Sequence, residues 1–315
     1  MKSCGRLAVT GLLWAGLALV AAADERPRAI AITIDDLPFV RAGSLARARA
    51  GTDAILGALR AHQAPAIGFV NEDKLLIDGE VDARIGLLES WLAAGMELGN
   101  HNFGHVGFQT TPLAQYEEAV LKGEVVTRWL LARRDRKLRY YRHPMTQTGP
   151  TAADKASFET FLAEHGYRVA PFTIEHDDFV FAAVYADALV RGDSAGAARV
   201  REAYLAHLDP ALDTFESMAQ DLFGRAIPQV LLIHANLLNA DCLDAMLSRL
   251  AQRGYHFTTL DEALEDPAYG SPDGYVGPHG PSWLRRWSLG LQRPTHFKGQ
   301  PDPPAWISER YGPLR

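Results

Sequence analysis

The sequence predicts an α/β fold built on a mostly parallel sheet or barrel. Three observations predict it. Short runs rich in β-branched and aromatic residues alternate with amphipathic helical segments along most of the chain. Gly95, Gly166 and Gly254 each stand between a helical segment and the next strand, where a residue with positive φ can end a helix. The chain has 315 residues, 47% of them hydrophobic, which is enough to bury a large core.

The elements can be predicted in chain order from these patterns. Strands are expected at 28–34, 65–70, 138–142, 167–174, 229–234 and 255–260, with a further short strand-like run before His101. Amphipathic spacing predicts helices at 44–62, 82–95, 112–134, 151–166 and 241–254. A longer helical stretch at 184–223 interrupts the alternation and is interpreted as an insertion. The segment 267–315 is rich in Pro, Gly and Trp, so we expect an irregular extension that wraps over the domain.

The N-terminus has the layout of a secretory signal. Lys2 and Arg6 precede an apolar run at 7–20, and three alanines at 21–23 follow it. We therefore expect residues 1–23 to be removed and the folded domain to span 24–266. A membrane anchor is the alternative, but the apolar run is shorter than the ~20 residues that a spanning helix needs. The protein is predicted to be exported, to the periplasm or beyond, without stable membrane insertion after cleavage.

Charge and cysteine content narrow the partners. The formal net charge is −6 and no basic run has the character of a nucleic-acid footprint, so a nucleic-acid partner is not expected. A neutral ligand such as a sugar is compatible with this balance. Cys4 leaves with the predicted signal, so Cys242 would be the only thiol of the mature chain. Its helical apolar context favours a small buried hydrophobic residue over a nucleophile.

Two adjacent carboxylates end the first strand of the mature chain. Asp35 and Asp36 follow an Ile- and Thr-rich run, and Pro38 closes it. Ligands of parallel α/β proteins bind at the carboxyl ends of the strands, which favours a functional interpretation. The alternative for an isolated pair is that one Asp caps the following segment and the other is solvated.

Two histidines occur four residues apart in a segment rich in Gly and Asn. His101 and His105 can reach one cation if the backbone turns helically between them, although two exposed loop histidines are the alternative. Two imidazoles and one carboxylate from another strand end form a three-ligand site with room for water. This pattern is typical of catalytic zinc, whereas a structural zinc site would be expected to bring thiolates.

The ordered motifs TIDDLP, HNFGH, YRHPMTQTG, DDFVF and VLLIH resemble those of a known enzyme family. They are similar to the signature of the polysaccharide deacetylases, which carry the NodB-homology domain of carbohydrate esterase family 4. The resemblance covers about residues 28–264. It implies a distorted (β/α)7-type barrel and a metal-dependent hydrolase that removes acetyl groups, usually from N-acetylated sugars.

The resemblance also implies roles for individual residues. Asp36, His101 and His105 match the metal ligands of the family, and Asp35 matches the catalytic base. His234, at the end of VLLIH, matches the general acid that protonates the departing amine. On its own, His234 would instead be interpreted as a strand-end residue bonded to a loop carbonyl.

Three further residues match supporting positions of the family. Arg142 matches the arginine that orients the base, Pro144 shapes the adjoining groove wall, and Asp178 is the expected partner of the catalytic histidine. Phe179 stands where the family commonly has Trp, which keeps an apolar wall but removes an indole donor. Without the family, Arg142 would be interpreted equally well as a surface ion pair.

These observations predict a metal-dependent deacetylase acting on an acetylated carbohydrate, most directly on N-acetyl amides. The expected cofactor is a divalent metal ion, Zn(II) in the first place. Two alternatives share the fold: a hydrolase of a small non-polymeric amide or an O-acetyl ester, and a catalytically silent glycan-binding protein. A third alternative is an envelope scaffold that uses the Trp-bearing extension.

Overall fold

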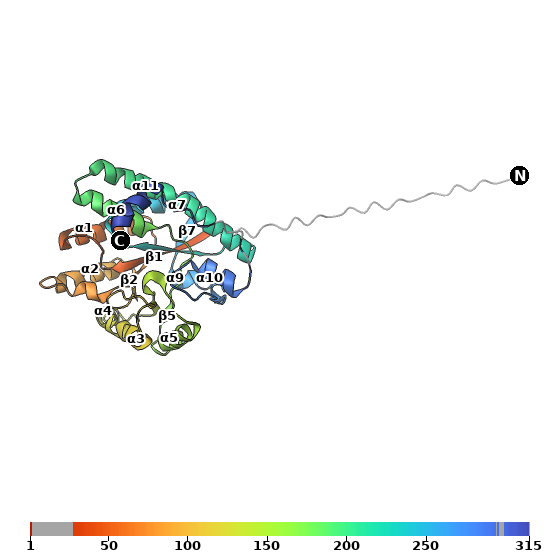
Figure 1. The fold of residues 1–315 in the computed structure, drawn as a ribbon, viewed down its shortest axis with the longest axis horizontal. Coiled ribbons are helices and arrows are strands. Elements are labelled where there is room, and N and C mark those ends of the chain that lie inside the picture. The colour runs from red at the N-terminus through yellow and green to blue at the C-terminus, as the bar shows by residue number, and fades with distance from the viewer. Residues whose placement is uncertain (2–27, 294, 296–298, 315) are drawn as a thin grey trace.

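The structure is a computed structural model that describes residue 1 and residues 28–293, 295 and 299–314 (Figure 1). Apart from Met1, the predicted signal segment 1–23 lies outside these residues. Among the described residues, no helix combines the length and the apolar character needed to cross a bilayer.

In the part of the chain that the structure describes, seven parallel strands form one curved sheet. They are β1 (Arg28–Leu37), β2 (Ala66–Val70), β3 (Glu97–Asn100), β4 (Tyr140–Tyr141), β5 (Arg168–Val169), β6 (Gln229–His234) and β7 (Tyr255–Thr258). The strand order is β5-β4-β3-β2-β1-β6, and β7 also pairs with β1. Beyond β5, Ile174 forms a parallel bridge with Leu231 of β6. This bridge joins the two edges of the sheet, so the predicted distorted (β/α) barrel is confirmed.

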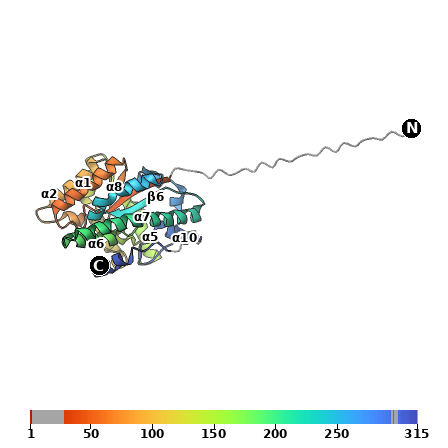
Figure 2. The same ribbon diagram turned by 90° about the horizontal axis from the view of Figure 1, so that it is seen from above.

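Helices cover the outside of this barrel. They are α1 (Leu45–Ala61), α2 (Val81–Ala93), α3 (Leu113–Lys122), α4 (Val125–Ala132), α5 (Ala152–Glu164), α6 (Asp178–Val190), α7 (Ser194–Phe223), α8 (Leu237–Gln252) and α9 (Leu260–Ala263). Helices α1 and α8 lie side by side, and α6 pairs with α7 (Figure 2). Apolar side chains of β1, β2 and β6 and of the facing helices form one buried core.

The single helix predicted at 112–134 is wrong, because the chain forms two helices there. Gly123 lies between α3 and α4, and a Cβ at this position would come within 2.8 Å of the backbone nitrogen of Phe103. The first turn of α4 is bonded to Glu72, whose carboxylate accepts from the backbone N–H groups of Val126 and Thr127 at 3.0 and 2.7 Å. These tertiary contacts explain a new helix start that amphipathic spacing does not reveal.

The predicted insertion at 184–223 consists of two helices. Its predicted beginning was wrong, because α6 already starts at Asp178, directly after the barrel-closing segment. The chain turns at Gly192, and the Asp193 side chain caps α7 by accepting from the N–H of Gly196 at 2.8 Å. Helix α7 ends at Phe223 with Gly224 in the left-handed region.

The C-terminal extension contains more regular structure than predicted. Helices α10 (Trp283–Gly290) and α11 (Ala305–Tyr311) form between its irregular stretches, with the short 3-10 turns η3 (Pro267–Gly270) and η4 (Gly312–Leu314). Trp287 and Ile307 are buried in the main core. The prediction of an irregular wrap therefore underestimated how far apolar burial would order short helices here.

Candidate active site

The carboxyl ends of the parallel strands bring the predicted residues to one end of the barrel. Asp35 and Asp36 lie at the end of β1, His101 follows β3, Arg142 follows β4, and His234 ends β6. This is where parallel α/β sheets place their ligands. The structure therefore brings together all of the residues predicted as metal ligands, base and acid.

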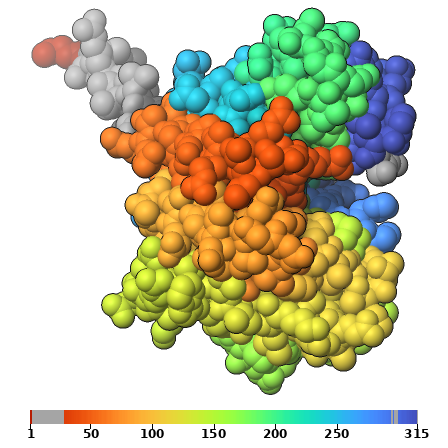
Figure 3. All heavy atoms as spheres, turned by 90° about the vertical axis from the view of Figure 1, so that its left-hand side faces the viewer, coloured from red at the N-terminus to blue at the C-terminus, as the bar shows by residue number. Residues whose placement is uncertain are grey.

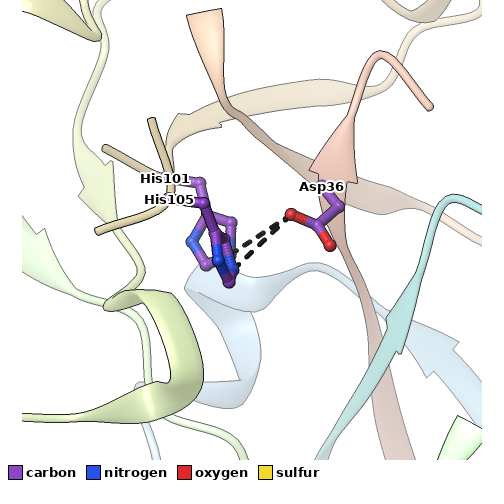
Figure 4. A group of neighbouring side chains, drawn as sticks. All are labelled: Asp36, His101 and His105. Atoms are coloured by element: carbon purple, nitrogen blue, oxygen red, sulfur yellow. Dashed lines mark ion pairs between the residues drawn. The ribbon is translucent and has the colours of Figure 1, made fainter. Parts of the chain in front are cut away.

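Asp36, His101 and His105 form a compact group. One ligand atom from each lies within 4.8 Å of the others, and the side chains point toward one another (Figure 4). Asp36 Oδ1 is 4.0 Å from His101 Nε2 and 3.7 Å from His105 Nε2. Two imidazole nitrogens and a carboxylate oxygen are the donors that a catalytic zinc site uses.

The backbone at Asp36 differs from simple strand alternation. The pairing of β1 with β2 is irregular between Ile34 and Leu37, and Asp36 has a φ of 70°. Alternation alone would direct Asp35 and Asp36 to opposite faces, but this irregularity lets both of them line one pocket.

The protonation of the three side chains suits a cation. His101 Nδ1 donates to the carbonyl oxygen of Arg142 at 2.8 Å, which leaves Nε2 directed at the group. Burial lowers the pKa of His101 well below its usual value and also lowers the pKa of His105, which favours neutral imidazoles. Burial would raise the pKa of Asp36, but the charge of Lys74 and the histidines outweighs it, so the pKa falls and the carboxylate is ionised. The residues present thus fit a divalent metal ion.

Lys74 is a site residue that the sequence reasoning missed. Its Nζ lies 2.7 Å from Asp36 Oδ1 and 2.6 Å from the side-chain oxygen of Asn71. Asn71 in turn donates to the backbone carbonyl of His101 at 2.6 Å. The only sequence signal was position, since both residues follow the carboxyl end of β2.

Asp35 is buried beside the cluster, and its two carboxylate oxygens have different surroundings. It is only 2% exposed, and its Oδ2 is 3.5 Å from Arg142 Nη1 and 3.7 Å from His101 Nε2. Among the described residues, its Oδ1 has no hydrogen-bond partner. Burial raises the pKa of Asp35 to about 6, opposed by the positive charges of Arg142 and His234. A carboxyl with this pKa and an unpartnered oxygen can accept a proton near neutral pH.

Arg142 is held in place from several sides and is not a surface ion pair. The side chain is fully buried, its Nη2 donates to Thr33 Oγ1 at 3.0 Å, and its guanidinium lies 4.8 Å from the centre of the Phe69 ring. Burial lowers the pKa of Arg142, and the Asp35 charge opposes this effect. Arg142 is therefore the fixed cation beside Asp35.

His234 has its own carboxylate partner. Its Nδ1 is 2.7 Å from Asp178 Oδ1, and its backbone N–H donates to Asp178 Oδ2 at 2.9 Å. Asp178 Oδ2 also accepts from the side chain of Asn239 at 2.7 Å. Burial disfavours the charged imidazole, but Asp178 outweighs it and raises the pKa of His234 to about 10. The predicted contact between Asp178 and His234 is therefore present, and it leaves Nε2 available to the pocket.

The remaining predicted residue, Pro144, is not among the residues that line the pocket. It is buried and begins a short 3-10 turn, η2 (Pro144–Thr146). The wall itself is made by the next two residues, Met145 and Thr146, which both have positive φ. Pro144 precedes these two residues directly, and its role in shaping the wall stays a prediction.

One pocket of about 480 Å³ is lined by Asp35, Asp36, His101, His105, Asp178 and His234. Phe179 lines it beside the acid candidate, with its ring centre 6.3 Å from that of His234. The wall also includes residues that the sequence analysis did not single out: Val40, Arg41, Phe172, Glu175, Asp177, Ala182, Ala186, Leu232, Asn236, Leu237, Gly280 and Tyr311. A cavity of this size lies within the range of small-ligand sites.

Comparison with known families decides the relationship. The family model for polysaccharide deacetylases matches residues 22–177. Residues 22–177 therefore belong to the polysaccharide deacetylase family. The match includes the Asp-Asp pair, both histidines of the cluster and Arg142, whereas Asp178 and His234 follow it in the chain. No curated protein shows a match to the chain.

Solved structures of polysaccharide deacetylases share the fold. Peptidoglycan deacetylase PdaC from Bacillus subtilis aligns with a TM-score of 0.50 and 17% identity, over 79% of this chain and 96% of that one. A pseudoenzyme of carbohydrate esterase family 4 from Bacillus anthracis aligns with a TM-score of 0.51 and 15% identity, over 76% of this chain and 66% of that one. A mutant of this pseudoenzyme with restored enzymatic activity aligns equally well, at 0.51. At these identities the likeness concerns the fold.

Proposed function

We propose that this polysaccharide deacetylase family member is a metal-dependent deacetylase that hydrolyses acetyl groups, above all N-acetyl amides, of a carbohydrate. One observation carries the proposal. Two proton-transfer groups, each with its own charged partner, line the same pocket as the cluster of two histidines and a carboxylate. A protein that only binds glycans has no need for a base and an acid at the same site.

The residues divide the work of amide hydrolysis as follows. A divalent cation held by Asp36, His101 and His105 would polarise the acetyl carbonyl and lower the pKa of a water molecule. Asp35 takes the proton of the attacking water on its unpartnered Oδ1. His234 donates a proton to the departing nitrogen, which avoids expulsion of an amide anion. Acetate and a free amine are the products.

Two residues position the proton-transfer groups. Arg142 stabilises the ionised form of Asp35, so the base is available near neutral pH. Asp178 holds the Nδ1–H of His234 and favours its protonated form, so the acid is charged before the reaction begins.

Zn(II) is the proposed metal, because neutral imidazoles with one carboxylate are a common zinc donor set. Affinity order does not by itself decide which ion is bound in the cell. Elemental analysis of the protein as purified, followed by reconstitution with Zn(II), Co(II) and Ni(II), would identify the ion that supports turnover.

Export is proposed from the sequence layout of residues 1–23. The substrate would then be a glycan of the cell envelope or outside the cell. Fractionation of cells that express the chain with and without these residues tests this point: export should require them.

The first test is acetate release by residues 24–315 from N-acetylglucosamine oligomers, peptidoglycan and O-acetylated xylan, each with and without chelator. Chelator-sensitive release from an N-acetylated substrate supports the proposal. Asp35→Asn is the matched control, and it should retain metal while turnover falls by roughly 10²–10⁴-fold. Metal-loaded protein that releases no acetate from any substrate would contradict it.

The alternatives predict different outcomes in the same assay. Release from acetylated xylan alone would indicate an O-acetyl esterase. Sugar binding without release, equal in wild type and Asp35→Asn, would indicate a glycan-binding protein. The second outcome has to be tested because pseudoenzymes are among the proteins that share this fold.

A further inference from the structure

The C-terminal extension forms part of the active-site pocket. Two of its residues, Gly280 and Tyr311, line the same cavity as Asp35 and His234. They lie 31 positions apart in the sequence, yet both reach the rim of the barrel. In Figure 3 the C-terminal helix, in dark blue, lies directly against the helices of the insertion, in green.

The first contact is between Gly280 and the loop after β4. Thr146 Oγ1 donates to the carbonyl oxygen of Gly280 at 2.8 Å, and a Cβ on Gly280 would lie 1.4 Å from Thr146 Oγ1. The fully buried Arg286 holds this region from behind by donating to the backbone carbonyl of Thr146 at 2.5 Å and to Thr148 Oγ1 at 2.9 Å. The extension is thus firmly fixed to the pocket wall on this side.

The second contact is between Tyr311 and the insertion. The Tyr311 ring meets that of Phe179 edge to face at 6.1 Å, and Phe179 is next to His234. Ile307 is fully buried, and the guanidinium of Arg199 on α7 lies 4.1 Å from the Trp306 ring. These contacts anchor α11, so Tyr311 is a fixed part of the wall.

A third contact lies between these two. The side chain of Gln300 donates to Asp177 Oδ2 at 3.1 Å, and Asp177 also lines the pocket. The extension therefore contacts the rim at the loop after β4, at the barrel-closing segment and at α6. An internal unit of a long polymer needs a groove that is open on two sides, and one side of this pocket is occupied by the extension.

We infer that the C-terminal extension restricts the pocket to one or two sugar rings of an acetylated glycan, with Tyr311 as a specificity-determining residue. The choice of an acetylated glycan as the substrate rests on the proposed function. The pocket volume of about 480 Å³ agrees with a small ligand. The apolar ring pair of Phe179 and Tyr311 offers a surface for the apolar face of a sugar.

Binding measurements test this inference without turnover. Isothermal titration of Zn(II)-loaded Asp35→Asn with N-acetylglucosamine oligomers of one, two, four and six units should give an affinity that stops rising at the disaccharide. When Tyr311→Ala is added to this variant, the affinity for the tetrasaccharide should be at least fivefold higher than the affinity for the disaccharide. Glu309→Gln alters an exposed residue of the same helix, so it should behave like the parent.

A second variant probes the pocket from α6. Ala186→Leu adds bulk on α6 inside the cavity and should weaken disaccharide binding at least fivefold. Tenfold tighter binding of the tetrasaccharide than of the disaccharide by the parent would overturn the inference, as would binding of no oligomer. A different result is that the wild-type protein releases no acetate while the affinity for oligomers still stops rising at the disaccharide. That result would overturn the proposed function and leave the inference standing. Melting temperatures of all variants establish that α11 remains folded.

Discussion

Asp35 and His234 are direct neighbours across the pairing of β1 and β6. They are register partners in the parallel ladder, and the N–H of Ala235 donates to the carbonyl oxygen of Asp35 at 2.9 Å. The candidate base and the candidate acid are therefore positioned by two paired strands and not by loops. Such placement keeps the distance between the two groups fixed while a substrate enters.

Removal of Arg142 should move the acid limb of the pH–rate profile to higher pH. Activity requires ionised Asp35, whose pKa of about 6 a bound cation would lower, so the wild-type midpoint should be no higher than about pH 6. Arg142→Met removes a charge that favours ionised Asp35, and the midpoint should rise by about one pH unit or more. Arg142→Lys retains the charge and should shift it less. An unchanged midpoint in Arg142→Met would show that Arg142 does not influence the pKa of Asp35.

Loss of Asp178 should affect the opposite limb. His234 must be protonated to act as an acid, and Asp178 is the main group that raises its pKa toward about 10. Asp178→Asn should therefore shift the alkaline midpoint to lower pH and reduce kcat more than it changes KM. A pH profile of kcat for both proteins is the measurement. The same alkaline midpoint in both would show that Asp178 does not act through His234.

Replacement of His101 should remove metal without unfolding the protein. His101→Ala deletes one of three ligands, so bound metal should fall and activity should be lost, while the melting temperature of the metal-free protein changes little. His256→Ala is the matched control, because His256 is exposed and outside the cluster. Elemental analysis after gel filtration gives the answer, and full occupancy in His101→Ala would remove this residue from the ligand set.

A methyl group at Gly280 should be costly. Gly280→Ala would place Cβ within 2.4 Å of the Met145 carbonyl oxygen as well as against Thr146, and such overpacking typically costs roughly 1–3 kcal/mol. Gly270→Ala is the control, since nothing lies within 4 Å of its added Cβ. Urea unfolding of both variants tests the difference, and equal midpoints would show that the extension does not press on the loop after β4.

The alternation of strands and helices predicted a mostly parallel sheet or barrel, because each parallel strand must be followed by a helical return, and the family resemblance implied the barrel. Strand ends placed Asp35 and Asp36, since position at a strand end is local information, whereas His234 was singled out by the resemblance of its motif. Gly280 and Tyr311 could not be found in this way, and Lys74 offered no signal beyond its position after β2. Their place in the site depends on approaches between distant segments, for which a loop lysine or a C-terminal tyrosine gives no periodic signal.

The same reason explains the errors in the helices. Gly123 divides the predicted helix at 112–134 because it contacts the loop that carries the histidines, and Glu72 caps the second part from another segment. The short helices α10 and α11 depend on burial of Trp287 and Ile307 in the shared core. Short helices of low intrinsic stability form when tertiary packing supports them, and the local sequence shows this only weakly.

Metal titration is the most direct test of whether deacetylation depends on a bound metal ion. Metal-free protein, prepared with chelator and checked by elemental analysis, would be titrated with Zn(II) while acetate release from an N-acetylglucosamine oligomer is followed. We expect no acetate release at the start. Release should then rise with added Zn(II) until one equivalent of metal per chain is present, and it should not rise in His101→Ala. Full acetate release by the metal-free protein would contradict a metal-dependent deacetylase.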